Sequence, residues 1–193
     1  MASNKFVSER VFIKNARLSY PALDEPKSDF GNDPKFQATF LVPEGSETAK
    51  ELSGAVRRVA TEFFGDSAKN VMVGNANPLH RGSEKNPVPD GYEGMIYIKA
   101  KSKNRPKLVG AKPSKNYTEP LEIREAFKPG NYVNAYITLF AYDKGSRGVA
   151  ATLDAVQFRS VGDPLTGAAS FDFPDESGAS ADGLGFEEED TPF

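Results

Sequence analysis

Residues 132–142 alternate strictly between two kinds of side chain, and this alternation constrains the fold more than any other feature. The odd positions carry Val, Ala, Ile, Leu and Ala, whereas the even positions carry Tyr, Asn, Tyr, Thr, Phe and Tyr. Successive side chains of a β-strand point to opposite faces, so the segment predicts a strand with an ordinary core face. The other face mixes rings with hydrogen-bonding groups, which favours a partly wet surface over a second core.

Residues 95–103 repeat the alternation with positive charge. Positions 96, 98 and 100 are apolar, and the intervening and following positions carry Tyr97, Lys99, Lys101 and Lys103. The connection after this strand is also basic, because residues 94–118 contain no Asp or Glu. Cations that track phosphates beside rings that stack on bases are typical of proteins that bind single-stranded nucleic acid.

We therefore predict a DNA-binding face on these two strands. Its expected residues are Tyr97, Lys99, Lys101, Lys103, Arg105, Lys107, Tyr132, Tyr136, Phe140 and Tyr142. Two plainer explanations stay open at this stage. A lysine-rich edge strand can serve only to block aggregation between sheets, and any one of the rings can pack beneath a helix or loop.

The remaining pattern predicts one domain that is mostly β, in the α+β class. Further strands are expected at residues 11–20, 35–42 and 148–158, and long connections at 70–94 and 104–120. A single amphipathic helix is expected to begin after Ser46 or Thr48, because apolar residues then recur at spacings of three and four until Gly65.

Charge divides the chain into two unlike parts. Residues 160–193 contain nine of the 27 Asp and Glu residues and neither Lys nor Arg. The preceding residues hold the other 18 acidic residues against 24 basic ones, a formal charge of +6. An acidic segment rich in Gly, Ser and Ala cannot bury enough apolar surface to offset chain entropy. We predict an ordered domain at residues 1–160 and a disordered acidic tail at 161–193.

The last seven residues are expected to be a docking peptide for another protein. Four consecutive carboxylates and a proline precede a final ring, which is too isolated to join a core. A ring that also carries the terminal carboxylate suits an apolar pocket flanked by Lys or Arg. The residues predicted for partner binding are Glu187, Glu188, Glu189, Asp190, Pro192 and Phe193.

Several other classes of protein are disfavoured. The chain has no cysteine, which excludes disulfides and thiolate metal sites, and its N-terminus lacks an apolar run of signal-peptide length. No segment approaches a membrane span, so a soluble, intracellular protein is expected. The single histidine, His80, has no evident catalytic partner. We expect no enzyme activity, no cofactor and no bound metal.

Two alternatives from other classes stay open. The carboxylates Asp24, Glu25, Asp29 and Asp33 could hold a divalent metal in a nuclease. The basic body could instead belong to a virion component or a protein-interaction module that binds an acidic partner.

Two parts of the chain carry a resemblance to known families. The tip Asp190-Thr191-Pro192-Phe193 resembles that of bacterial single-stranded DNA-binding proteins. Residues 127–135 and 148–158 resemble a family of phage single-stranded DNA-binding proteins with an OB fold. This chain lacks the tryptophans on which many bacterial members stack DNA, so Tyr and Phe would replace them.

The resemblance implies a five-stranded OB-fold barrel with bases lying across one sheet face. It also implies a role in phage DNA replication or recombination, in the cytoplasm of the infected host cell. The acidic tail would recruit replication proteins such as a polymerase or primase-helicase, and it would compete with DNA for the basic groove. The bacterial tetramer does not carry over, and a monomer or a dimer is equally compatible with the sequence.

Overall fold

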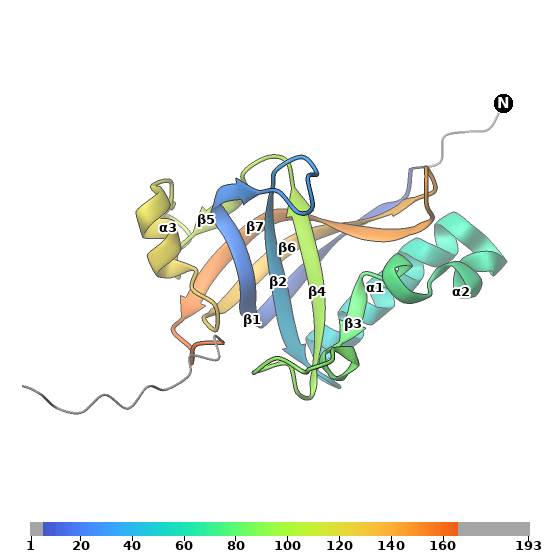
Figure 1. The fold of residues 1–193 in the computed structure, drawn as a ribbon, viewed down its shortest axis with the longest axis horizontal. Helices are drawn as coiled ribbons and strands as arrows, with labels where there is room; N and C mark the ends of the chain where they lie inside the picture. Colours follow the sequence, from blue (N-terminus) through green and yellow to red (C-terminus); the bar gives the residue numbers. More distant parts are fainter. Residues whose placement is uncertain (1–5, 166–193) are drawn as a thin grey trace, which may run out of the picture.

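Seven strands and three α-helices make up the part of the chain that the computed structural model describes, residues 6–165 (Figure 1). The strands are β1 (Ser8–Lys27), β2 (Lys35–Pro43), β3 (Leu79–Arg81), β4 (Met95–Ser102), β5 (Lys107–Val109), β6 (Tyr132–Tyr142) and β7 (Gly148–Ser160). The helices are α1 (Glu47–Phe64), α2 (Ala68–Val71) and α3 (Pro120–Ala126). Short 3₁₀ turns lie at Gly65–Ser67, Gly74–Ala76 and Gly82–Glu84.

The strands form one sheet that closes on itself. Their order is β3-β4-β2-β1-β6-β7-β5, and an additional parallel pairing joins β4 to β7. This pairing places Lys101 opposite Thr152 and completes a five-stranded barrel from β1, β2, β4, β7 and β6. The expected OB-type barrel is therefore confirmed, with β3 and β5 added outside the ring of five.

The first strand is long enough to serve both halves of the barrel. Its first part, from Ser8 to Arg17, pairs with β6, and its later part, from Arg17 to Lys27, pairs with β2. Register shifts interrupt both ladders. Irregularities of this kind bend a strand and increase its twist, which lets one strand curve around a small barrel.

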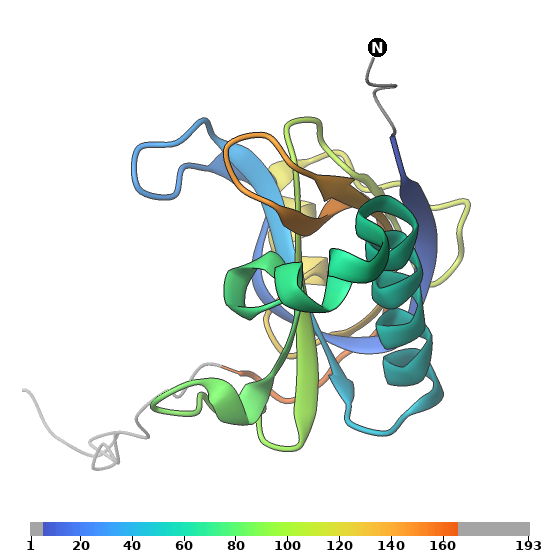
Figure 2. The same cartoon turned by 90° about the vertical axis from the view of Figure 1, so that its right-hand side faces the viewer.

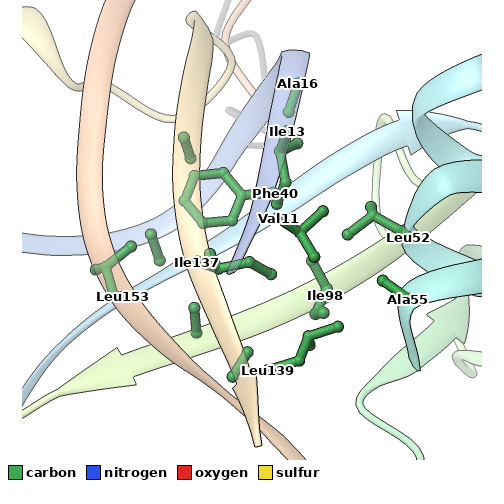
Figure 3. Packing of buried hydrophobic residues seen from close by; sticks show 14 of the residues in the cluster. Val11, Ile13, Ala16, Phe40, Leu52, Ala55, Ile98, Ile137, Leu139 and Leu153 are labelled. Atoms are coloured by element: carbon green, nitrogen blue, oxygen red, sulfur yellow. The ribbon is translucent and has the colours of Figure 1, made fainter. Parts of the chain in front are cut away.

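The core fills the barrel with the apolar positions that the alternation predicted. Alternate residues of β6 are buried, and the tyrosines, threonine and phenylalanine between them are partly exposed. Figure 3 shows Ile137 and Leu139 inside the barrel with Phe40, Ile98 and Leu153 from other strands. Leu52 and Ala55 of α1 point toward this cluster, so the helix covers an open part of the barrel.

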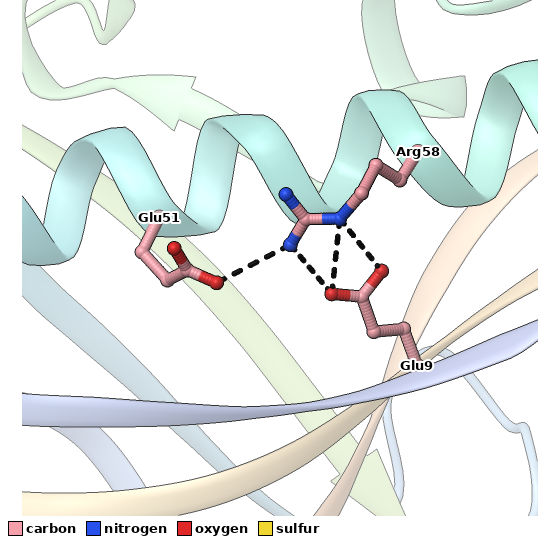
Figure 4. Close-up of polar contacts among 3 residues, drawn as sticks. All are labelled: Glu9, Glu51 and Arg58. Carbon is pink, nitrogen blue, oxygen red and sulfur yellow. Dashed lines mark hydrogen bonds and ion pairs between the residues drawn. The ribbon is translucent and has the colours of Figure 1, made fainter.

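Helix α1 begins and ends where the sequence predicted. The Ser46 hydroxyl accepts a hydrogen bond from the Ala49 amide at 3.1 Å, and Gly65 follows the last turn with a positive φ of 58°. Arg58 joins the helix to β1 by donating to the Glu9 carboxylate at 2.6 Å, and it also reaches Glu51 (Figure 4). Arg58 and Glu51 are largely exposed and Glu9 is half-buried, so the contacts orient the helix more than they stabilise the fold.

The five predicted strands and the single main helix are all present. β1 is longer than the expected strand at residues 11–20, and the expected connections at 70–94 and 104–120 contain β3 and β5. Across residues 6–165, none of the helices has the length and apolar character needed to cross a bilayer. The predicted disordered tail lies outside the described residues, apart from its first five positions.

Candidate functional site

A broad hollow of about 740 Å³ crosses the outer surface of the barrel where β4, β7 and the end of β6 meet. We call it the cationic groove. Its lining includes six of the residues that were predicted to bind DNA: Tyr97, Lys99, Lys101, Lys103, Phe140 and Tyr142. The structure therefore brings together side chains from two strands that are not neighbours in the sheet.

Small residues of β7 form the floor of the cationic groove. Thr152 lies opposite Lys101 on one side and Thr138 on the other, and Ala150 lies opposite Phe140. Short side chains here leave space between the lysines of β4 and the rings of β6. The result is a shallow channel between two rows of side chains. We call Lys99, Lys101 and Lys103 the lysine bank, and Phe140 and Tyr142 the aromatic bank.

Phe140 and Tyr142 supply the aromatic bank at the end of β6. Their ring centroids are 6.4 Å apart, and both side chains remain partly exposed. Gly148 permits this arrangement, because a Cβ atom there would lie 2.8 Å from the Tyr142 hydroxyl and 2.7 Å from the Ala76 carbonyl oxygen. The absence of a side chain at the start of β7 therefore allows Tyr142 to lie across it.

Tyr97 occupies the far end of the groove within its own cluster. The His80 ring stacks on it at 5.4 Å, Tyr92 meets it edge to face at 5.4 Å, and the Lys85 ammonium lies 4.9 Å from its centroid. Burial raises the pKa of the Tyr97 hydroxyl, and the negative charge of Glu84 adds to the effect. Tyr97 is thus held firmly while part of its surface still lines the groove.

The lysine bank faces carboxylates from the loop between β1 and β2, residues 28–34. Asp29 accepts hydrogen bonds from Lys101 at 2.8 Å and from Lys99 at 3.3 Å, and Asp33 lies 3.5 Å from Lys103. The hydrogen bond from Lys101 and the charge of Lys99 lower the pKa of Asp29. A carboxylate bridging two ammonium groups occupies the kind of position that a phosphate would take.

Two other residues predicted to bind DNA lie in a different hollow. Tyr136 and Lys107 line a depression of about 260 Å³ together with Phe12, which we call the aromatic hollow. The rings of Phe12 and Tyr136 are 4.8 Å apart, and both are well exposed. This hollow is mainly apolar, and Lys107 is its single cationic lining residue among the described part of the chain.

The last two predicted residues make their contacts elsewhere in the fold. Arg105 donates to the carbonyl oxygens of Thr118 and Asp24, which ties the connection before α3 to the end of β1. Tyr132 lies beneath the Arg17 guanidinium, at 5.9 Å from the ring centroid. Neither residue lines the cationic groove, so their role in binding stays a prediction from the sequence.

The groove also has lining residues that were not predicted to bind DNA. Lys35, His80 and Lys85 lie along it. Lys35 could have been predicted to line the groove, because it begins a predicted strand in which the alternate positions 35, 37 and 39 are polar. His80 lies in β3 and Lys85 follows the turn after it, and their positions depend on β3 pairing with β4, which no local pattern reveals.

The carboxylates considered for a nuclease have other partners. Asp24 and Glu25 pair with Arg124, and Asp29 and Asp33 pair with the lysine bank. Within residues 6–165, no group of three or more His, Asp or Glu side chains could hold a metal ion. The residues predicted for partner binding at positions 187–193 lie outside the described part of the chain.

A closed five-stranded barrel with a lysine bank and an aromatic bank across one outer surface defines a binding domain of the OB type. The chain belongs to the family described as "Enterobacter phage Enc34, ssDNA-binding protein", whose model matches residues 9–183. A protein called p50 from Acyrthosiphon pisum secondary endosymbiont phage 1 is 31% identical over 166 residues, covering 82% of this chain and 87% of that protein.

Solved structures agree on the fold. The single-stranded DNA-binding protein of bacteriophage Enc34 in complex with ssDNA superposes with a TM-score of 0.70 at 23% identity, over 81% of this chain and 89% of that one. A C-terminal truncation of the same phage protein gives a TM-score of 0.63 at 26% identity, over 80% and 87% of the two chains.

Proposed function

We propose that this chain is a non-enzymatic protein that binds single-stranded DNA without sequence preference, for phage DNA replication or recombination in the cytoplasm of the infected cell. The cationic groove carries the proposal, because it sets a row of lysines opposite a pair of rings across a floor of small residues. Membership of the phage family supports the same conclusion.

In this proposal, the phosphates of the strand follow Lys99, Lys101 and Lys103, and the bases turn toward Phe140 and Tyr142. Rings accept any base, because every base has a π-face, and the lysines recognise only charge. Both contacts therefore give affinity with little sequence preference. A single strand can turn its bases toward these rings, whereas the bases of a duplex are stacked and paired inside.

The acidic tail has two further proposed roles. Its negative charges compete as an intramolecular polyanion for the lysine bank, at the high effective concentration that a tether gives. When DNA fills the groove, the tip with Phe193 becomes available to a replication protein. The charge contrast between the tail and the +6 body supports this arrangement.

The test of DNA binding is fluorescence anisotropy with labelled oligo-dT over a series of salt concentrations. We expect affinity to fall steeply with salt, with a logarithmic slope of about 0.7 for each phosphate contacted. Duplex DNA of equal length and heparin serve as competitors. A flat salt dependence, or competition by heparin as strong as that by oligo-dT, would contradict the proposal, and cleavage of DNA that requires magnesium would indicate a nuclease.

The test of tail competition is a truncation after Leu165. This end point keeps the Asp163 carbonyl, which accepts a hydrogen bond from Arg17 at 2.7 Å, and the contact of Gly162 with Asn131. We expect the truncated protein to bind oligo-dT more tightly at low salt. A matched control keeps the full length and replaces residues 187–190 with the corresponding amides. Unchanged affinity in both variants would reject competition and leave partner recruitment to be tested by pull-down.

A further inference from the structure

The tip of the β1–β2 loop presents a phenylalanine to solvent beside the cationic groove. Phe30 is fully exposed, although its neighbours along the chain carry charge or no side chain. Its φ of 52° lies in the left-handed region, and Gly31 follows with a φ of 79°. A bulky residue rarely adopts this backbone conformation, so an observed case suggests a functional role.

The loop holds Phe30 in a defined place. Both the backbone amide and the side-chain amide of Asn32 donate to the Asp29 carbonyl oxygen, at 3.1 and 2.9 Å, and the Ser28 hydroxyl donates to the Asn32 carbonyl. The Asp29 carboxylate in turn reaches Lys99 and Lys101. The residue immediately before Phe30 is therefore fixed to the lysine bank.

The surface beneath the loop continues the cationic groove. A smaller hollow of about 220 Å³ lies between the loop and β4, and it shares Lys35, Lys101 and Lys103 with the groove. A single strand of DNA that follows the lysine bank along β4 therefore passes under the loop. Figure 2 shows the loop, in light blue, projecting beyond the barrel wall.

We propose that Phe30 stacks on a base of the bound strand, as a third aromatic contact beyond Phe140 and Tyr142. This inference rests on the proposed function, because it takes single-stranded DNA as the ligand. Three observations support it together: full exposure of the ring, the left-handed backbone that presents it, and the anchoring of Asp29 to the cations that would hold the neighbouring phosphates.

A tryptophan reporter tests the stacking directly. The chain contains no tryptophan, so Phe30→Trp introduces a single indole at the loop tip. Stacking on a base quenches indole fluorescence, and we expect strong quenching when oligo-dT is added. The matched control is Leu121→Trp on α3, another exposed apolar position on a helix that supplies no residue to the cationic groove. Its fluorescence should stay unchanged.

Affinity provides the second measurement. Phe30→Ala should weaken binding of oligo-dT by roughly fivefold or more, the lower bound for losing one stacked base. Phe30→Leu should lose nearly as much, since it keeps apolar bulk but removes the ring, and Leu121→Ala should bind as the unaltered protein does. Position 30 is fully exposed, so the substitutions should leave the fold intact, which a thermal melt verifies.

Failure of this inference differs from failure of the proposed function. If the unaltered chain does not bind oligo-dT, the proposed function fails. If it binds, but Phe30→Ala binds equally well or the indole is not quenched, the role of Phe30 is overturned and the rest stands. Sedimentation without DNA tests whether Phe30 instead contacts a second copy of the chain. Self-association that is lost in Phe30→Ala would assign the ring to that contact and overturn stacking.

Discussion

The cationic groove and the aromatic hollow both take rings from the outer face of β6, yet they differ in their neighbours. Phe140, near the end of the strand, lies across β7 from the lysines of β4. Tyr136, four residues earlier, lies opposite Phe12 of β1, and its hollow is mainly apolar. The same alternation therefore produces two surfaces of different chemistry.

The difference shows that an aromatic strand face does not by itself define a nucleic-acid site. A base stacks on a ring, but its phosphate must meet a cation nearby for the strand to be retained. Of the two regions, only the cationic groove has several rings and several cations, because closure of the barrel brings β4 next to β7. Substitutions in the two regions should therefore have unequal effects on DNA binding.

The largest effect should come from Phe140→Ala. Loss of one stacked base costs roughly 1–3 kcal/mol, or roughly 5- to 150-fold in the Kd for oligo-dT. Anisotropy titration measures the change, and a thermal melt shows whether the half-buried ring also supports the fold. A stable variant with unaltered affinity would remove the aromatic bank from the site.

The next effect concerns charge and is tested by the double substitution Lys99→Ala with Lys101→Ala. Two lost phosphate contacts reduce the salt slope by about 1.4, which corresponds to about 25-fold weaker binding at 0.1 M salt. Lys107→Ala in the aromatic hollow is the matched control and should leave the slope nearly unchanged. Equal salt slopes for the double lysine variant and Lys107→Ala would show that the groove and the hollow do not differ in phosphate contacts.

A smaller effect of opposite sign is expected from Asp29→Asn. The variant keeps an oxygen that can accept from Lys101 but removes the negative charge, so binding should tighten by up to about fivefold at 0.1 M salt. The lysines lower the pKa of Asp29 below its usual 3.8, so the group is ionised at every higher pH. The gain should therefore be the same at pH 6 and pH 8, and weaker binding would show that the loop anchor matters more than the charge.

The smallest effect is expected from Tyr136→Ala. An oligonucleotide of about eight nucleotides, within the range for one OB-type fold, fills the cationic groove and leaves the hollow empty. Its Kd should change by less than about twofold, because the lost contact is with Phe12 and not with a base. A loss as large as that of Phe140→Ala would extend the binding surface along the whole of β6 and restore the broader prediction from the sequence.

Most of the barrel could be predicted from local pattern. The strict alternation at β4 and β6 identified both the strands and their outward faces, and Ser46 and Gly65 marked the helix ends. The strands that escaped prediction, β3 and β5, are three residues long and exist only because they add to an edge of the sheet. Such short segments carry no periodicity of their own.

The site was predicted in part, for a related reason. The sequence identified which side chains face outward, but it could not say which strands would be neighbours. Arg105 and Lys107 follow the lysine row closely in sequence, yet the chain leaves the groove after Asn104 and directs them elsewhere. The loop carboxylate Asp29 was considered for a metal, because it lies among other carboxylates in the sequence. Its partner Lys101 is 72 residues away, so no local pattern indicated the pairing.

The pairing that closes the barrel has a thermodynamic consequence. Within the described residues, β4 and β7 share one parallel register pair, Lys101 with Thr152, whereas β6 and β7 are paired along their whole length. A strand of DNA that contacts the lysines of β4 and the rings of β6 spans this junction, which has the fewest register pairs in the sheet. Binding and closure are then linked, because a ligand that prefers the closed form stabilises it by mass action. Amides at the junction should exchange with solvent more slowly once DNA is bound.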